Sequence, residues 1–324
     1  MKSFFIPVFF ACICHNVFAQ TPADTMLFPT TDTIASTRLD TVFTGKKIIT
    51  LSSVVIDKNL DVAGFIKKIQ QDSSYYKAFK NLHILGYTAI NDIRMLDKKG
   101  GLDASLRSRT RQVRKNNCRS MQVLEETATG DFYTKNGAYN YFTAQMYASL
   151  FLTKDTVCGE NNVVGDAAFS MQGKSGLEKR KEQLKMLFFN PGRRISGLPF
   201  MSNKTAIYDD DMADRYNMTI DFDTYNNEPC YVFKQIAKSG KKNGVIVDEM
   251  ITWFNEKTFE VMARKYSLSY DAAVYDFKVE MEVQMRSFNN LTVPVLIRYN
   301  GNWKVVSKKR ERGVFTATLF NFER

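Results

Sequence analysis

The sequence predicts an α+β protein made mainly of antiparallel strands, a long curved meander or unclosed barrel with amphipathic helices packed on or in it. Three observations predict this fold. Apolar and polar residues alternate throughout 273–286, which indicates an unusually long strand with one buried face. Further strand-like runs follow closely through 216–322, and helical spacing is confined to a few segments. Antiparallel strands of this length form twisted sheets, so we expect a curved one.

The N-terminus has the features of an exported protein. Residues 1–19 are typical of a signal peptide, because an apolar run follows Lys2 and a small-residue cleavage pattern ends at Ala19. Lipidation at Cys12 is the alternative for this segment. Residues 20–45 are rich in Thr, Pro and Asp, which predicts a flexible tail, and their Asp-Thr-apolar triplets resemble the O-glycosylation acceptor of Bacteroidetes bacteria. We expect a location in the periplasm or cell envelope, with outer-membrane association left open.

Residues 46–174 form a basic half with mixed α and β character. A β-branched run predicts a strand over 48–56, and helical spacing predicts a helix over about 60–71 that Asp61 would cap. The remaining elements expected in this half are strands at 81–97, 102–115 and 121–127, the first two joined by a hairpin at 98–101, and a helix at 138–153.

Residues 175–324 predict one helix followed by a sheet. The helix spans 176–189, and Asn190-Pro191-Gly192 ends it. The expected strands are 216–223, 229–237, 245–254, 258–270, 273–286, 291–299, 302–310 and 313–322. Asn300-Gly301 predicts a hairpin turn between two of them, Pro294 predicts an edge or bulge, and the broken pattern at Arg264-Lys265 predicts a second bulge. The two halves of the chain are compatible with one domain or with two.

Composition excludes several kinds of chemistry. The chain carries a formal charge of +11 but only two histidines. His83 lies in a predicted strand with no nucleophile motif near it, so His-dependent catalysis is not expected. Cys118, Cys158 and Cys230 are too scattered for a zinc site and allow at most one disulfide, with the pairing undetermined. We predict no metal and no cofactor. A glycan hydrolase that uses paired carboxylates from distant strands remains a third, weaker interpretation.

The positive charge gathers in one conspicuous place. Arg107, Arg109 and Arg111 alternate along one face of a predicted strand, and Arg114 follows them. Adjacent guanidinium groups repel one another unless solvent, salt or an anion screens them, so this row is either a solvated outer face or an anion-binding surface. Export makes lipid headgroups or acidic glycans the expected anions rather than nucleic acid.

The C-terminal strands resemble those of outer-membrane lipoprotein-sorting carriers. The resemblance is carried by 211–222 (DMADRYNMTIDF), by 228–238 (EPCYVFKQIAK) and by 245–264 with its Trp253-Phe254-Asn255 corner. It covers about 175–324, and the chain as a whole resembles uncharacterised exported proteins of Bacteroidetes. The family implies an open, curved antiparallel barrel whose concave, helix-covered side holds acyl chains. It implies no catalytic residue. The basic N-terminal half has no counterpart in the family, and Asn255 stands where an acidic residue is usual.

The sequence therefore favours a non-enzymatic periplasmic protein that binds a lipid, a lipoprotein acyl chain or another amphiphile on the concave side of its sheet. The helix at 176–189 would act as a lid, and cations at the rim would contact the headgroup. The residues expected to line the concavity are Tyr275, Phe277, Val279, Met281, Val283, Leu184 and Phe188. The alternative is a structural or accessory module of the cell envelope that binds anionic glycan or a partner protein through its basic face. Whether the concavity is empty, and the oligomeric state, are not predicted.

Overall fold

The computed structural model describes residues 39–44, 47–52, 55–56, 60–164, 186–195, 201, 203–271, 275–305 and 309–324. All of them belong to one compact unit that spans residues 36–324. The predicted signal peptide and most of the predicted tail lie outside the described residues. The end of that tail, Leu39–Thr44, is a strand.

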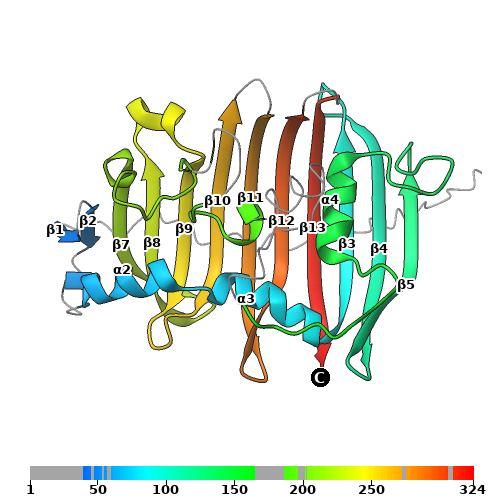
Figure 1. Ribbon diagram of the computed structural model, residues 1–324, viewed down its shortest axis with the longest axis horizontal. Helices are drawn as coiled ribbons and strands as arrows, with labels where there is room; N and C mark the ends of the chain where they lie inside the picture. The colour runs from blue at the N-terminus through cyan, green and yellow to red at the C-terminus, as the bar shows by residue number, and fades with distance from the viewer. Residues whose placement is uncertain are drawn as a thin grey trace, which may run out of the picture. The chain divides into compact units, whose positions relative to one another are not determined.

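The described strands form one sheet, mainly antiparallel, that curves behind three helices (Figure 1). Its strands are β1 (Leu39–Thr44), β2 (Lys47–Ser52), β3 (Gly86–Leu96), β4 (Leu102–Lys115), β5 (Cys118–Thr129), β6 (Thr156–Cys158), β7 (Tyr216–Tyr225), β8 (Glu228–Ala237), β9 (Val247–Asn255), β10 (Val261–Asp271), β11 (Tyr275–Phe288), β12 (Leu291–Val305) and β13 (Glu311–Glu323). The helices are α2 (Val62–Gln71), α3 (Ser74–Asn81) and α4 (Phe142–Phe151), with short 3-10 turns η1 (Leu82–Ile84), η3 (Ala213–Arg215) and η4 (Ser239–Gly244). The predicted class, a mainly antiparallel α+β fold with an unclosed sheet, is confirmed.

The two halves of the chain share this sheet. Its strand order is β1-β2-β7-β8-β9-β10-β11-β12-β13-β3-β4-β5-β6, so the C-terminal meander occupies the middle and N-terminal strands lie at both ends. The pairing of β2 with β7 is parallel, and the other neighbouring pairs are antiparallel. One face of the sheet is covered by α2, α3 and α4 (Figure 1), and we call this the inner face.

Local sequence explains α2 well. The side chain of Asp61 accepts a hydrogen bond from the Gly64 amide at 3.0 Å, which caps the helix as predicted. Val62, Phe65, Ile66 and Ile69 are buried on one side of it. The expected helix at 138–153 is also present, as α4. By contrast, α3 was not predicted, and His83 lies in η1 rather than in a strand, so that expectation was wrong.

Three hairpins turn at Asn-Asn pairs. Both residues of Asn116–Asn117, of Asn226–Asn227 and of Asn289–Asn290 have φ between 48° and 64°. Two consecutive positive φ values match the twist of antiparallel strands, and asparagine tolerates this conformation better than most residues. These pairs connect β4 to β5, β7 to β8 and β11 to β12.

The hairpin predicted at Asn300-Gly301 is wrong. β12 runs through this dipeptide, and Gly301 pairs with Val279 on one side and with Gly313 on the other. Glycine is required here for a different reason. A Cβ at position 301 would collide with the hydroxyl of Tyr299, which leans over it on the same face of the sheet.

Of the two irregularities predicted in the strands, one is present. The register of β11 against β12 shifts where Gln284 pairs with Leu296 and Met285 pairs with Pro294, so the predicted bulge at Pro294 is confirmed. The bulge predicted at Arg264-Lys265 is wrong, because these residues pair regularly with Thr252 and Ile251 of β9. The register of β10 shifts instead between Val261 and Ala263 and between Ser267 and Leu268. Of the predicted 176–189 helix, 186–189 is helical, and the rest lies outside the described residues.

One disulfide joins two neighbouring strands. Cys118 in β5 bonds to Cys158 in β6 across 40 positions of sequence. Cys230 is a free, buried thiol whose pKa burial raises to about 12. At most one bridge was expected, and the structure identifies its partners. In the described part of the chain, no helix is long and apolar enough to cross a membrane.

Candidate ligand-binding site

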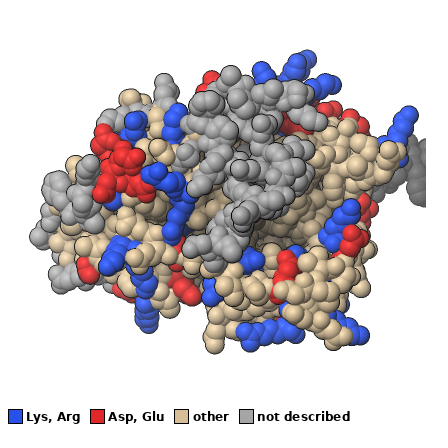
Figure 2. Space-filling model, in the orientation of Figure 1, with Lys and Arg blue, Asp and Glu red and all other residues tan. Residues whose placement is uncertain are grey.

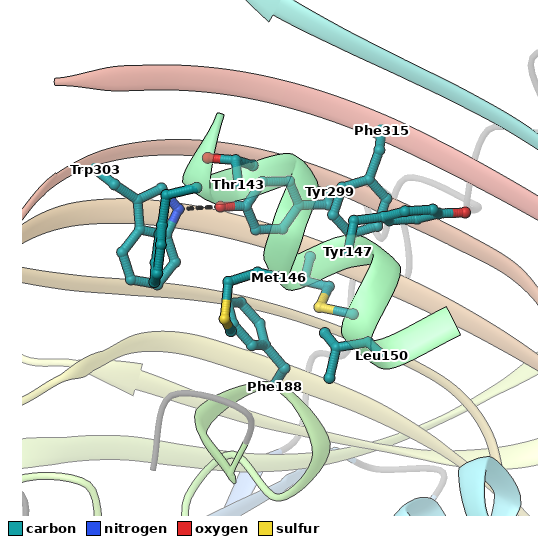
Figure 3. Close-up of a pocket in the computed structure, with 10 residues that line it drawn as sticks. Thr143, Met146, Tyr147, Leu150, Phe188, Tyr299, Trp303 and Phe315 are labelled. Atoms are coloured by element: carbon teal, nitrogen blue, oxygen red, sulfur yellow. Dashed lines mark hydrogen bonds between the residues drawn. The ribbon is translucent and has the colours of Figure 1, made fainter. Parts of the chain in front are cut away.

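An apolar cavity lies on the inner face, between α4, the helical turn at 186–189 and strands β11 to β13 (Figure 3). The described lining is almost entirely aromatic and aliphatic and contains no acidic or basic side chain. The lining residues are Phe142, Thr143, Met146, Tyr147, Leu150, Phe188, Met281, Tyr299, Trp303 and Phe315.

The sheet side of the cavity is an aromatic wall. The rings of Tyr299 and Phe315, on neighbouring strands, stack at 4.5 Å with an interplanar angle of 6°. The indole N–H of Trp303 donates a hydrogen bond to the Tyr299 hydroxyl (Figure 3). Tyr299, Gly301 and Trp303 lie on the same face of β12. Because Gly301 has no side chain, it leaves the space that the Tyr299 ring occupies in the wall.

The opposite side of the cavity is α4, which is held by polar contacts at its margins. The carboxylate of Glu311 accepts hydrogen bonds from the amides of Phe142 and Thr143, each at 2.8 Å, and so caps the helix from the sheet. One turn further on, the Tyr147 hydroxyl donates to Oδ1 of Asn91 at 2.5 Å. Met146 and Leu150 of α4 point into the cavity (Figure 3).

The helical turn at 186–189 closes a third side. The ring of Phe188 lies 5.9 Å from both the Tyr299 and the Trp303 rings. The carbonyl oxygen of Phe188 accepts a hydrogen bond from the Tyr266 hydroxyl at 2.6 Å. The neighbouring Phe189 ring packs against Phe79 of α3 at 4.6 Å. This turn therefore connects the cavity to the helices that cover the rest of the inner face.

The cavity is almost filled by the protein's own side chains. The space that a water-sized sphere can occupy is about 20 Å³, which is room for about one water molecule. Small-molecule sites usually enclose about 300–1,000 Å³. An amphiphile would therefore have to displace side chains or a whole element to enter.

The predicted concavity residues are partly brought together here. Phe277, Val279, Met281 and Val283 are all buried, with 2% or less of each exposed, and they alternate on β11 as expected. Of the predicted set, Met281 and Phe188 line the cavity. Phe277 lies behind it, with its ring 5.1 Å from that of Trp303. The side chains of Tyr275 and Leu184 lie outside the described residues.

Sequence reasoning missed most of the aromatic wall. Had 291–305 been interpreted as one strand, the spacing of Ile297, Tyr299 and Trp303 would have placed all three on one buried face. The hairpin predicted at Asn300-Gly301 divided this strand into two, so the shared face of these residues was not predicted. The α4 residues were recognised as helical, but nothing in the sequence indicated that they pack on β12 and β13.

The arginine row lies on the other face of the sheet. Along β4, Arg107, Arg109 and Arg111 alternate with the buried Ser108 and Thr110 and are exposed. Each guanidinium lies within 4 Å of a carboxylate; the pairs are Arg107 with Asp92 at 3.3 Å, Arg109 with Glu125 at 3.6 Å and Arg111 with Glu323 at 3.0 Å. Strands β3, β5 and β13 thus supply an acid for each arginine. Exposed pairs of this kind contribute little to stability.

Arg114 does not belong to that row. Its guanidinium donates to the His83 carbonyl oxygen at 2.6 Å and to Oδ1 of Asn117 at 2.7 Å. On the helix-covered side, acidic and basic side chains are interspersed over the part of the surface that is described (Figure 2). Within the described ranges, no group of three or more His, Cys, Asp or Glu side chains is arranged to hold a metal ion.

No protein-family model and no curated protein matches this sequence. Solved structures similar to the chain include a DUF1329 family protein from Desulfovibrio piger, at 10% identity and TM-score 0.24, covering 77% of this chain and 93% of that one. They also include a putative outer membrane lipoprotein-sorting protein domain from Vibrio parahaemolyticus, at 6% identity and TM-score 0.26, covering 80% and 90%. A LolA superfamily protein from Nitrosomonas europaea matches at 9% identity and TM-score 0.22, covering 74% and 85%.

Proposed function

We propose that this protein binds the acyl or alkyl chain of an amphiphile, such as a lipid or a lipoprotein, between α4 and the inner face of β11 to β13. The observation that carries the proposal is the apolar cavity itself. It is lined by aromatic and methionine side chains, it lies on the concave side of an unclosed sheet, and one wall is a short separate helix. Methionine side chains adapt readily to chains of different shape. Met146 of α4 and Met281 of β11 both line this cavity.

Binding would exchange one apolar contact for another. The ligand chain would take the place of Met146, Leu150 and Phe188 against the aromatic wall, while α4 moves away from the sheet. The apolar contacts of α4 are non-directional, and burial of the ligand chain contributes about 25 cal/mol for each Å² removed from water. The ligand would thus replace much of the stabilisation that α4 loses on release.

The chemistry of the cavity favours binding over catalysis. Its polar groups are a threonine, two tyrosines and a tryptophan. Burial raises the pKa of Tyr147 and of Tyr299, so both hydroxyls stay protonated at neutral pH. The described lining residues include no general base, no activated nucleophile and no carboxylate pair, so they can hold a chain but offer no group to cleave one.

Two features support a location in the periplasm or cell envelope. Residues 1–19 have the pattern of a signal peptide. The Cys118–Cys158 disulfide is typical of proteins that fold in an oxidising compartment.

Calorimetric titration of the protein with decan-1-ol tests the proposal, together with native mass spectrometry for lipid that co-purifies. Met281→Trp would fill the cavity from the sheet side, and Glu280→Trp is the matched control because Glu280 is exposed on the opposite face of the same strand. We expect the wild type and Glu280→Trp to bind decan-1-ol, and Met281→Trp to bind it at least about tenfold more weakly, since overpacking blocks the chain.

Circular dichroism establishes that both variants are folded before the affinities are compared. If the wild type neither carries lipid nor takes up decan-1-ol, the proposed function is wrong. If both tryptophan variants bind like the wild type, binding occurs somewhere other than this cavity.

A further inference from the structure

A buried arginine lies on the inner face beside the cavity. Arg264 of β10 is 5% exposed. Its Nε donates to the hydroxyl of Thr252 at 3.0 Å, and its guanidinium carbon lies 4.2 Å from the centre of the Tyr75 ring. Among the described residues no aspartate or glutamate forms an ion pair with it.

Other polar groups around Arg264 are also incompletely satisfied. The Tyr75 hydroxyl is buried and makes no hydrogen bond of ordinary geometry, although it interacts with the Tyr266 side chain. Oε1 of Gln235 is buried and has no hydrogen-bond partner in the described structure, whereas Nε2 of the same side chain donates to the Tyr208 hydroxyl at 3.3 Å. Burial raises the pKa of Tyr75 and of Tyr208, and the positive charge of Arg264 acts in the opposite direction on both. Tyr75 of α3 and Thr252 of β9 thus both contact a buried cation for which the described residues supply no carboxylate.

This cluster is adjacent to the cavity. Arg264 pairs with Val283 across the sheet, and Tyr266 pairs with Met281. Arg264 and Tyr266 are two positions apart and both buried on the inner face, so their backbones are separated by about 7 Å. The Tyr266 hydroxyl contacts both the Phe188 carbonyl and the Met281 sulfur, and Phe188 and Met281 line the cavity. One row of side chains therefore separates the cation from the cavity.

We propose that Arg264 binds the anionic headgroup, a carboxylate or phosphate, of the amphiphile whose chain occupies the cavity. This inference rests on the proposed function and specifies its ligand class. A buried charge without a counterion is costly, by several kcal/mol in proteins generally. A carboxylate or phosphate would accept two parallel hydrogen bonds from the guanidinium group and neutralise it, and the Tyr75 hydroxyl would supply a further donor.

The row Arg107, Arg109 and Arg111 is less suited to this role. Those arginines lie on the opposite face of the sheet from the cavity, and each already has a carboxylate within 4 Å. Headgroup recognition by Arg264 would instead place the charge and the chain of one ligand on the same face.

The first test compares three ligands of equal chain length on the wild-type protein by calorimetry. Decanoate carries an anionic head, decan-1-ol a neutral one and decylamine a cationic one. A charge-assisted bidentate contact predicts that decanoate binds about tenfold or more tighter than decan-1-ol, and that decylamine binds most weakly. Acetate and inorganic phosphate, each without a chain, serve as the probes for a free anion and should bind far more weakly than decanoate.

The second test uses two neighbouring positions. Arg264→Met removes the charge at similar length, and Lys265→Met is its matched control because Lys265 is exposed on the other side of the strand. We expect Arg264→Met to lose about tenfold or more in decanoate affinity while its decan-1-ol affinity stays unchanged, and Lys265→Met to change neither. The melting temperature of ligand-free Arg264→Met should equal or exceed that of the wild type, since a buried uncompensated charge is removed.

The outcomes separate the two proposals. If no ligand binds, the proposed function fails, and this inference fails with it. If decan-1-ol and decanoate bind equally well to the wild type, the cavity function stands and the headgroup inference is overturned. This comparison needs no variant, so it decides the matter even if Arg264→Met does not fold. Tight binding of phosphate alone would overturn the inference in favour of a free-anion site.

Discussion

The inner face of the sheet has two regions of opposite character, and α4 touches both. On β3 the buried Asn91 donates to the hydroxyls of Ser108 and Thr110 at 3.2 and 3.3 Å, and it accepts from Tyr147 of α4. On β12 and β13 the same helix faces Tyr299, Trp303 and Phe315 through apolar contacts. Directional hydrogen bonds fix one arrangement, whereas apolar contacts can be exchanged for a ligand at little cost. The polar region is suited to anchor α4, and the apolar region is suited to release it.

The largest expected effect comes from the apolar region. Trp303→Ala removes the indole and its hydrogen bond to Tyr299, and should lower the free energy of unfolding by about 3–5 kcal/mol, because it leaves a large cavity. Urea unfolding measures this. Trp303→Phe, which keeps an aromatic ring, should lose clearly less. An effect of Trp303→Ala below about 1 kcal/mol would mean that the wall is loosely packed, contrary to its ring distances.

Removal of the disulfide between β5 and β6 should lower stability less and should leave the apolar region unaffected. Replacing Cys118 and Cys158 together by serine is expected to lower the free energy of unfolding by about 2–4 kcal/mol, because the unfolded chain gains freedom. Decan-1-ol affinity should stay unchanged, since none of the described lining residues belongs to β5 or β6. A large loss of affinity in this variant would contradict the separation of the two regions.

The smallest effect concerns the polar anchor of α4. Asn91→Ala leaves the buried Tyr147 hydroxyl without its acceptor and should lower the free energy of unfolding by about 1–3 kcal/mol. Adding Tyr147→Phe should recover part of this loss, because the unpaired hydroxyl is then gone. Equilibrium unfolding of the two single variants and the double variant gives the coupling. Strictly additive losses would show that this hydrogen bond does not anchor the helix.

The sequence predicted elements whose signals are local. The Asp61 cap and the apolar spacing of α2 come from neighbouring residues, and both were correct. Turn chemistry was harder to interpret. Asn-Asn pairs marked three real hairpins, whereas Asn300-Gly301, a stronger dipeptide signal, lies within β12 because Gly301 makes room for Tyr299. That steric requirement is created by tertiary packing, and no local pattern shows it.

The candidate site was predicted only in part for the same reason. Alternation identified Met281 and its neighbours on β11. The opposite side of the cavity comes from α4, far away in the chain and brought there by the pairing of β13 with β3. Arg264 was predicted only to lie at an irregular position of its strand, since a charged residue in a strand is normally expected to face water. Its burial depends on α3, which the sequence did not predict.

Hydrogen exchange of α4 tests most directly whether the ligand enters by releasing this helix. We predict that saturating decan-1-ol speeds amide exchange in 142–151, because a helix of 10 residues is only marginally stable once detached from the sheet. Exchange in α2, at 62–71, should not change. Unchanged or slower exchange in α4, at a decan-1-ol concentration that calorimetry shows to be saturating, would contradict the account.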